Sequence, residues 1–343
     1  MKFNLPFKIL TVILVTLVMI LLLLYCAIGV IIHGPSPEAS RLLVTTLMET
    51  SAAKFVPKLY LSDEKIDEII GKVEESVDIK VDPALISLPS EGESTEAVTD
   101  NAAVTDTEPD VTSEPQNDGI EIYDIKGGTY NGKMMVISDP TRVFVGVPEN
   151  GFGAGKKGMT VYNMIQTYGA VAGTNAGGFD DPNGNGTGGI PDGIVISGGE
   201  LLWGDNNTYY SVAGLDKDGL LHVGKMTAKG ALERGIVEAA SYGPALIING
   251  EPQETYSGGL NPRTAIGQRA DGAILLLVIN GRSVDSLGAT LDDLTEIFLE
   301  YDAVNATNLD GGSSSIMIYD GEYITSSAYV YGERVVATSI LVK

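Results

Sequence analysis

The chain is poor in the residues that support several kinds of site. Its 343 residues include one cysteine, Cys26, and two histidines, His33 and His222. A single cysteine excludes an intrachain disulfide and a cysteine-based zinc site. Two distant histidines exclude a histidine-rich metal site and argue against a Ser-His-Asp triad. We predict that His222, within the apolar run 220–223, is a strand residue and not a catalyst.

Positive charge is also scarce. The chain has 22 lysines and arginines against 45 aspartates and glutamates, which gives a formal net charge of −23. Neutralising the phosphates of a nucleic acid requires clustered lysine and arginine side chains. The composition therefore excludes nucleic acid as an expected partner.

One long apolar run lies near the N-terminus. Residues 9–32 carry no charged side chain, and a helix over this run would be about 36 Å long, enough to cross a bilayer. Lys2 and Lys8 precede it, which favours a cytoplasmic N-terminus. A cleaved signal peptide is the alternative, although its apolar region is usually about 7–15 residues long. We predict a single-pass signal anchor over residues 1–33, with the following residues outside the cytoplasm.

The rest of the chain divides into three parts. Residues 34–80 are expected to form a helical membrane-proximal stalk, with helix starts at Ser36 and Ser62. Residues 81–118 contain no lysine or arginine and are rich in acidic residues. Such a segment cannot bury enough apolar surface to fold, so we predict a disordered linker that holds the next domain away from the membrane.

Residues 119–343 are expected to form the compact domain. Many short apolar runs and few helical segments predict an α+β domain built on a mixed β-sheet. Helices are expected over 160–168 and, after the N-cap Thr290, over 291–301. The expected strands are 120–125, 132–137, 142–147, 170–172, 193–196, 220–223, 245–248, 264–267, 274–279, 316–319 and 335–342.

The most distinctive stretch runs from Asn308 to Ser315. One carboxylate, Asp310, lies there among two glycines and three serines. Adjacent glycines let backbone N–H groups converge on an anion. A tight turn between two strands would use the same residue types, so the stretch is ambiguous when it is taken alone.

Two further motifs contain residues suited to binding. Residues 175–179, Asn-Ala-Gly-Gly-Phe, follow a predicted strand. Arg263 opens the strand in 261–267, and its planar guanidinium group matches phosphate or carboxylate. Taken singly, Arg263 fits a surface salt bridge equally well, and Asn175 fits a capping or turn position.

Together with residues 280–282, Asn-Gly-Arg, and the run 286–294, these motifs resemble one family, the phosphodiester glycosidases. It includes the N-acetylglucosamine-1-phosphodiester α-N-acetylglucosaminidases and bacterial proteins described as exopolysaccharide biosynthesis proteins. The resemblance covers residues 119–343. It implies hydrolysis of the bond between a sugar anomeric carbon and a phosphodiester, in envelope glycan or exopolysaccharide. One position departs from the family, which usually has aspartate where this chain has Asn280, and this shifts the catalytic role to Asp310.

The roles that follow combine the resemblance with simple chemistry. A phosphate leaving group carries its own charge and needs little protonation, so one carboxylate and a stabilised phosphate are sufficient. We predict Asp310 as base or nucleophile and Arg263 as the phosphate-stabilising residue, with no required cofactor. The predicted substrate contacts are Asn175, Gly177, Gly178, Phe179, Thr264, Asn280, Arg282, Gly311, Gly312, Ser313 and Ser314.

A calcium-binding loop is a further hypothesis. Asp181, Asn183, Asn185 and Asp192 have the spacing of oxygen ligands in such a loop, with Gly186 at the turn. Asp192 replaces the usual glutamate, and no flanking helix is evident. A solvated loop that covers the site is the alternative interpretation.

The aromatic residues beyond this loop also have two interpretations. Trp203, Tyr209 and Tyr210 have side chains that can stack on a sugar ring. A single tryptophan in an apolar run is more often part of the core, and we predict the core role for Trp203.

Three functions therefore remain open at this stage. The first is a membrane-anchored glycosidase with a phosphorylated glycan or sugar-1-phosphodiester as its partner and the membrane contacted through 9–32. The second is a glycan-binding or assembly module without catalysis, which the substituted Asn280 favours. The third is a metal-dependent phosphodiesterase that breaks the P–O bond.

Overall fold

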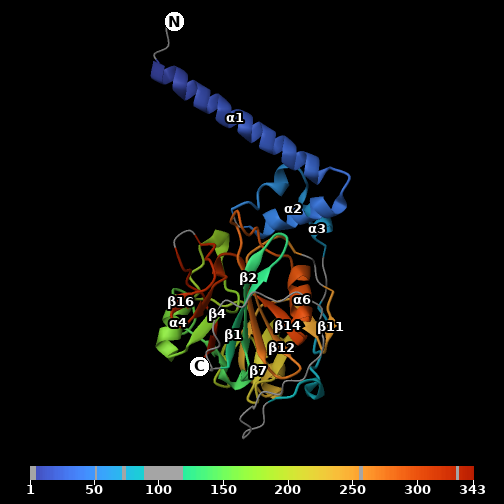
Figure 1. Cartoon of the computed structure of the whole chain (residues 1–343), viewed down its shortest axis with the longest axis vertical. Coiled ribbons are helices and arrows are strands. Elements are labelled where there is room, and N and C mark those ends of the chain that lie inside the picture. The colour runs from blue at the N-terminus through green and yellow to red at the C-terminus, as the bar shows by residue number, and fades with distance from the viewer. Residues whose placement is uncertain (1–4, 51, 72–74, 89–118, 255–257, 330–331) are drawn as a thin grey trace. The chain divides into compact units, whose positions relative to one another are not determined.

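The structure is a computed structural model that describes residues 5–50, 52–71, 75–88, 119–254, 258–329 and 332–343 (Figure 1). The chain forms two compact units, residues 1–72 and residues 73–343. The candidate site lies wholly within the second, larger unit.

The smaller unit is helical. It contains α1 (Leu5–Ile32), α2 (Pro37–Glu49), the short 3-10 helix η1 (Pro57–Leu59) and α3 (Asp63–Ile70). The Ser36 hydroxyl accepts the Ala39 N–H at 3.2 Å, and the Ser62 hydroxyl accepts the Lys65 N–H at 3.3 Å. Each serine thus satisfies a backbone donor in a first helical turn, which confirms the two predicted helix starts.

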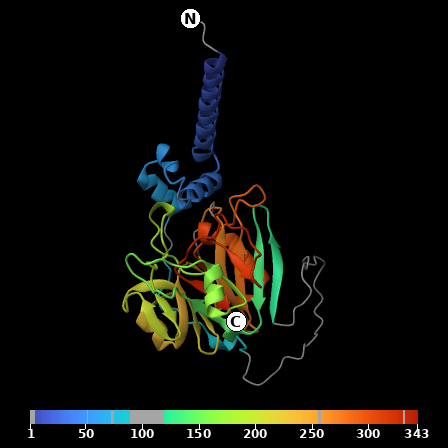
Figure 2. The same ribbon diagram turned by 90° about the vertical axis from the view of Figure 1, so that its left-hand side faces the viewer.

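Helix α1 is one unbroken helix (Figure 2). Its span from Lys8 to Ile32 has 25 residues and a mean hydropathy of 3.0, so it is long and apolar enough to cross a membrane. Within the smaller unit, Ile32 packs against Val44 and Ile66. The predicted apolar N-terminal helix is therefore present.

The larger unit is built from three antiparallel sheets. The seven-stranded sheet has the order β1-β2-β13-β12-β14-β10-β11, and the two five-stranded sheets have the orders β16-β15-β4-β17-β3 and β6-β5-β9-β7-β8. Sheets with few covering helices confirm the predicted α+β class. The predicted mixed sheet is replaced by antiparallel ones, since every pair of named strands is antiparallel. The strands are β1 (Ile120–Lys126), β2 (Asn131–Ile137), β3 (Val143–Gly146), β4 (Ala172–Asn175), β5 (Val195–Ser197), β6 (Glu200–Trp203), β7 (Tyr209–Asp216), β8 (Leu221–Thr227), β9 (Ile236–Ser241), β10 (Ala245–Ile248), β11 (Glu251–Pro252), β12 (Arg263–Arg269), β13 (Ile274–Ile279), β14 (Ala303–Leu309), β15 (Met317–Tyr319), β16 (Glu322–Tyr323) and β17 (Ser339–Val342).

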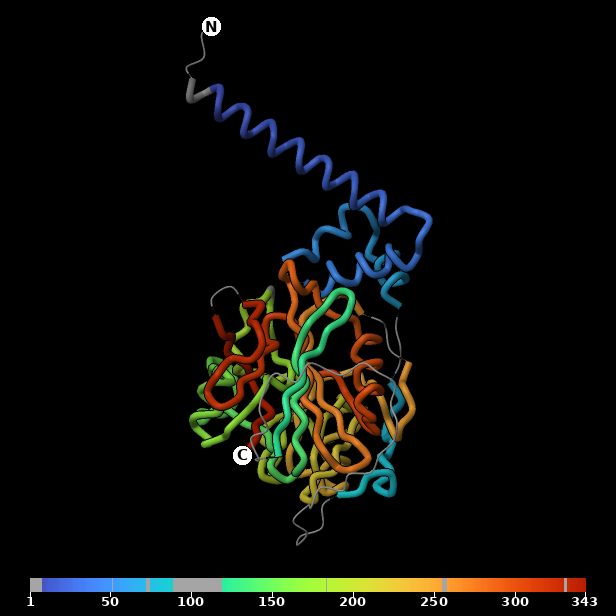
Figure 3. Tube along the Cα trace, viewed as in Figure 1, coloured from blue at the N-terminus to red at the C-terminus, as the bar shows by residue number. Residues whose placement is uncertain are grey.

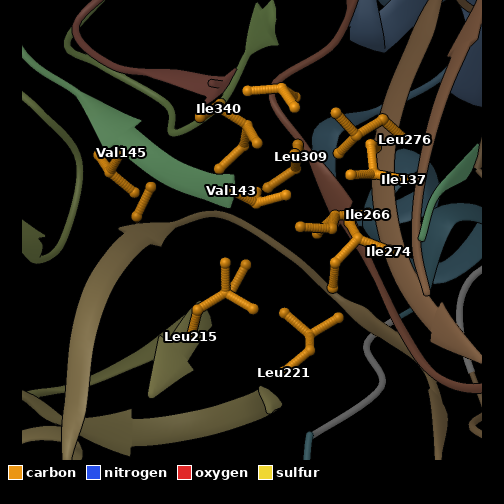
Figure 4. Close-up of a cluster of buried hydrophobic side chains, with 14 of the residues drawn as sticks. Ile137, Val143, Val145, Leu215, Leu221, Ile266, Ile274, Leu276, Leu309 and Ile340 are labelled. Carbon is orange, nitrogen blue, oxygen red and sulfur yellow. The ribbon is translucent and has the colours of Figure 1, made fainter. Parts of the chain in front are cut away.

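The central core lies where the three sheets meet (Figure 4). Strand β13 is buried on both faces because alternate side chains point to opposite sides of a strand. Ile274 and Leu276 enter this central core, whereas Leu275 and Leu277 enter a second cluster on the other face of the seven-stranded sheet. His222 is buried on β8, as predicted for a strand residue.

Three helices cover the sheets: α4 (Val161–Tyr168), α5 (Ala228–Glu233) and α6 (Leu291–Glu300). Helix α6 begins at Thr290 with a reciprocal capping box to Asp293. Its buried side chain Phe298 packs in the second cluster, on the outer face of the large sheet (Figure 1). The β1–β2 hairpin forms one edge of that sheet (Figure 3). Short 3-10 helices η2 (Pro83–Leu85), η3 (Pro140–Arg142), η4 (Pro182–Gly184) and η5 (Gly312–Ser314) complete the described elements.

Residues 75–88 differ from the sequence prediction, which divided them between stalk and linker. They belong to the larger unit. The Asp78 N–H donates to the Lys225 carbonyl at 2.8 Å, and the Ser87 N–H donates to the Ala270 carbonyl at 2.7 Å. Val81 and Ile86 are buried beside Leu220. These backbone hydrogen bonds and apolar contacts stabilise the segment against the larger unit in spite of its acidic composition. The remaining residues of the predicted linker, 89–118, lie outside the described residues.

Candidate active site

The site forms where two sheets meet. Strand β4 ends at Asn175 in a five-stranded sheet, and β14 ends at Leu309 in the seven-stranded sheet. The Asp310 N–H donates to the Ala176 carbonyl at 2.9 Å, and the Asn175 amide donates to the Asp310 carbonyl at 2.6 Å. Thr264, next to Arg263 on β12, pairs with Leu309. The structure thus brings together the three motifs that the sequence singles out.

Asn175 holds these segments in place. Its side chain is fully buried, and its Oδ1 accepts hydrogen bonds from the Thr264 hydroxyl at 2.8 Å and the Ile316 N–H at 3.3 Å. Its Nδ2 donates to the Asp310 carbonyl, so both ends of the amide form hydrogen bonds within the protein. In this way Asn175 and Thr264 position the Asp310 segment. Their predicted contacts with substrate stay a prediction.

The Asp310 carboxyl group is the unusual titratable group of the site. Burial raises its pKa from the ordinary value of 3.8 to about 7, and the negative charge of Asp181 acts in the same direction. The Ser314 hydroxyl, the positive charge of Arg334 and the Gly311 N–H oppose this rise. A carboxyl group with this pKa exchanges its proton near neutral pH, as a general base or acid requires.

The raised pKa makes Asp310 costly for stability. The unfolded chain ionises near pH 3.8 and the folded chain near pH 7, so stability falls as pH rises between these values and the loss is complete above pH 7. Asp310→Asn removes the ionisation, and we expect it to raise the melting temperature by about 3–8 °C at pH 8. The gain should nearly vanish at pH 4. Thermal unfolding of both proteins at the two pH values measures this, and an equal shift at both would contradict it.

Arg334 is a site residue that sequence reasoning missed. Its Nη2 lies 2.5 Å from the Asp181 Oδ1, and its Nη1 donates to the Ser313 hydroxyl at 3.1 Å. The guanidinium carbon lies 4.8 Å above the centre of the Phe179 ring. The arginine is buried, so its charge acts strongly on the nearby Asp310. A lone arginine in a Gly-Glu-Arg loop carries no sequence signal of this role.

Arg334→Gln should move the pH profile of any catalysis that depends on Asp310. Since the Arg334 charge lowers the Asp310 pKa, its loss should raise that pKa, and the acidic limb of kcat/KM should shift upward by about 0.5–1 pH unit. Arg269→Gln is the matched control, because Arg269 pairs with Asp271 at the far end of β12. Identical limbs in the Arg334→Gln and wild-type proteins would refute the coupling.

Arg263 and Arg282 form the cationic side of the site. Arg263 is buried and donates through Nε to the Ala289 carbonyl at 3.1 Å and through Nη2 to the Gly259 carbonyl at 2.7 Å. Burial and the adjacent Arg263 charge both lower the pKa of Arg282. Two neighbouring cations repel each other, and a bound anion would relieve that repulsion.

Gly311 and Gly312 do not form the anion-binding nest that the sequence predicts. The Gly312 N–H donates to the Pro262 carbonyl at 2.8 Å, and the Gly311 N–H acts on Asp310. A Cβ on Gly311 would lie 2.8 Å from the Pro262 carbonyl oxygen. The glycines therefore permit close packing of backbone segments, and the arginines supply the positive charge instead.

Gly177 and Gly178 have a similar packing role. The Gly177 N–H donates to the Thr338 hydroxyl at 2.9 Å. A Cβ on Gly178 would lie 2.7 Å from the Tyr242 ring and 3.2 Å from the Asp192 Oδ2. The bare glycine thus lets Asp192 approach the segment that follows β4.

Asn280, the position that departs from the family, supports the Arg282 loop. Its Nδ2 donates to the Asn131 Oδ1 at 2.7 Å, and its Oδ1 accepts the Ser326 N–H at 2.8 Å. Arg282 itself has a positive φ of 59°. Asn280 therefore joins separate segments around the loop that presents Arg282.

In the predicted calcium loop, Asp181 pairs with the side chain of Arg334. Asp181 also accepts the Gly186 N–H at 2.6 Å. Asn185 and Asp192 are exposed, and the side chain of Asn183 lies outside the described residues. In the described part of the chain, no three acidic, histidine or cysteine side chains are grouped to hold a metal ion. Calcium binding stays a prediction.

Arg334 acts on the Asp310 carboxyl group of raised pKa, and Arg263 and Arg282 lie against the two glycines that follow it. Such a grouping is typical of an enzyme site for an anionic substrate. A sequence model of the family described as phosphodiester glycosidase matches residues 168–343, just over half of the chain and all the site residues described above. The chain belongs to the phosphodiester glycosidase family.

The chain is also similar to individual curated proteins. The chain is 29% identical to the bovine N-acetylglucosamine-1-phosphodiester alpha-N-acetylglucosaminidase over 212 residues, 55% of this chain and 39% of the bovine protein. It is 37% identical to the SPbeta prophage-derived uncharacterized protein YomE of Bacillus subtilis (strain 168) over 101 residues, 28% of this chain and 16% of YomE. The chain thus spans less than half the length of these curated relatives.

A solved structure supports the fold. The catalytic domain of zebrafish N-acetylglucosamine-1-phosphodiester alpha-N-acetylglucosaminidase, auto-inhibited by its pro-peptide, has a TM-score of 0.54 at 24% identity. The similarity covers 68% of this chain and 87% of that chain.

Proposed function

We propose that this protein is a glycosidase that cleaves the sugar–phosphate bond of sugar-1-phosphodiesters in envelope glycan or exopolysaccharide. The observation that carries the proposal is one carboxyl group, Asp310, with a pKa of about 7 and with Arg334 acting on it. Arg263 and Arg282 lie against the adjacent glycines, Gly311 and Gly312. Membership of the phosphodiester glycosidase family and the activity named for the bovine relative support the same reaction class.

The chemistry divides between the two sides of the site. Asp310 in its ionised form acts at the anomeric carbon, either directly as a nucleophile or as a base that activates water. Arg282 and Arg263 stabilise the negative charge on the departing phosphate, which therefore needs no separate acid. Arg334 favours the ionised form of Asp310. The reaction yields a free sugar and a phosphomonoester.

We also propose that α1 anchors the protein in the membrane, with the N-terminus in the cytoplasm and the larger unit outside. The length and hydropathy of Lys8–Ile32 support a spanning segment, and the early lysines Lys2 and Lys8 support the orientation. A phosphorylated glycan of the envelope would then be the accessible substrate.

The test uses the full-length protein in detergent with uridine diphosphate-N-acetylglucosamine and a simple alkyl phosphodiester of N-acetylglucosamine, in ¹⁸O-labelled water. We expect a free reducing sugar and a phosphomonoester without ¹⁸O, because the glycosidic C–O bond breaks and the phosphate keeps its own oxygens. Label in the phosphate, with activity lost to a chelator, would identify a metal-dependent phosphodiesterase. Binding of polysaccharide without turnover would identify a non-catalytic glycan-binding module.

A further inference from the structure

A shallow hollow of about 520 Å³ lies beside the site. It is lined by residues 191–193, which include Asp192, by residues 202–204, which include Trp203, and by Tyr210. Ligand pockets usually measure about 300–1,000 Å³, so the hollow has room for a sugar ring.

Asp192 connects the hollow to the candidate active site. Its N–H donates to the Gly178 carbonyl at 2.9 Å, and its carboxylate lies against the same glycine. Asp192 is exposed as a whole, but local desolvation of its carboxyl group, together with the charges of Asp180 and Asp181, raises its pKa. Asp181 also raises the pKa of Asp310, so the charge of one residue acts on both carboxyl groups.

Two aromatic side chains, Trp203 and Tyr210, line part of a mainly polar hollow. The Trp203 ring is half-buried, packs edge-on against Phe152 and donates its indole N–H to the Pro191 carbonyl at 2.9 Å. Tyr210 is also half-buried and packs close to Gly193. Trp203 therefore joins the core, as predicted, and still contributes to the lining of the hollow.

We propose that this hollow binds the sugar ring of the substrate. The aromatic side chains provide rigid apolar area for the face of the ring, and the Asp192 carboxylate accepts hydrogen bonds from its hydroxyl groups. The sugar then lies on the Asp192 side of Asp310, and its phosphate lies towards Arg282. This assignment deepens the proposed function and rests on it for the order of sugar and phosphate along the site.

The chain supplies its own probe, because Trp203 is its only tryptophan. The experiment titrates the full-length protein, in a detergent without a sugar headgroup, with N-acetylglucosamine, N-acetylgalactosamine, glucose, galactose and mannose up to 100 mM (about the weakest useful range for a single sugar). At least one sugar should shift the Trp203 emission to shorter wavelength in a saturable manner, because the ring displaces water.

Variants make the assignment specific. Asp192→Asn should raise the half-saturating sugar concentration about tenfold, since it removes a charged hydrogen-bond acceptor. Glu200→Gln, an exposed change on the same strand as Trp203, should leave it unchanged. A flat titration for all five sugars, or equal binding by Asp192→Asn and Glu200→Gln, would overturn the proposal.

The outcome is independent of turnover. If the enzyme hydrolyses its substrate while the titrations stay flat, the proposed function stands and the hollow is not the sugar site. If sugar binds as described and no phosphodiester is hydrolysed, the hollow is a sugar site and the proposed reaction fails.

Discussion

Asp310→Asn should lower kcat for a sugar-1-phosphodiester by about 10³-fold or more, with little change in KM. The carboxylate is needed only at the reacting carbon, and an amide can neither accept the proton nor attack. In the wild-type protein, kcat/KM should rise with pH up to about 7, following the pKa of Asp310. Initial rates of free-sugar release between pH 5 and pH 9 measure both effects.

Asp320→Asn is the matched control, because Asp320 lies in the turn after β15 and should keep wild-type rates. Asparagine at 310 is expected to preserve or increase stability, so lost activity would not reflect unfolding. If Asp310→Asn retained more than a tenth of wild-type kcat, Asp310 would not be the base or nucleophile, and Asp192 would become the candidate.

Arg282→Asn should lower kcat/KM about 100-fold and weaken competitive inhibition by inorganic phosphate by a similar factor. The cause is the loss of a guanidinium group that is partly desolvated beside Arg263, where charge-assisted bonds to phosphate are strong. Asparagine is chosen because it tolerates the positive φ of this position better than alanine does.

Two readouts separate a phosphate role from a structural one. Phosphate inhibition constants should change in Arg282→Asn but not in Arg269→Asn, which removes an arginine paired with Asp271. The Trp203 sugar titration should stay at its wild-type value in both. A variant with weak sugar binding and unchanged phosphate inhibition would show that Arg282 acts on the sugar side.

The sequence predicts much of the fold where the residue types of a segment and its burial favour the same structure. Strands β10 (Ala245–Ile248) and β13 (Ile274–Ile279) have the predicted bounds, since continuous apolar runs match strands buried on both faces. Strands β7 (Tyr209–Asp216) and β9 (Ile236–Ser241) were not predicted. They contain alanine, serine and glycine, which favour strands weakly, so pairing and burial in the sheet decide their structure.

The sequence predicts which motifs form the site more readily than it predicts what each side chain does there. The motifs around Asn175, Arg263 and Asp310 do converge. Their side-chain roles depend on which hydrogen bonds the fold satisfies internally, and the buried Asn175 uses both ends of its amide within the protein. Arg334 was missed because its partners Asp181 and Ser313 are distant in sequence, and only the folded chain brings them together.

The position of residues 75–88 determines where the acidic segment that follows is attached. The Ser87 N–H is bound to Ala270, and the Gly119 carbonyl is bound to the Ser138 N–H, both within the larger unit. The acidic segment therefore begins and ends on the same body. A protease that cut it would produce a two-chain protein held together by the contacts of residues 75–88, and would leave the larger unit attached to α1. Under the proposed membrane anchoring, release of the larger unit would require a cut before Glu75 instead.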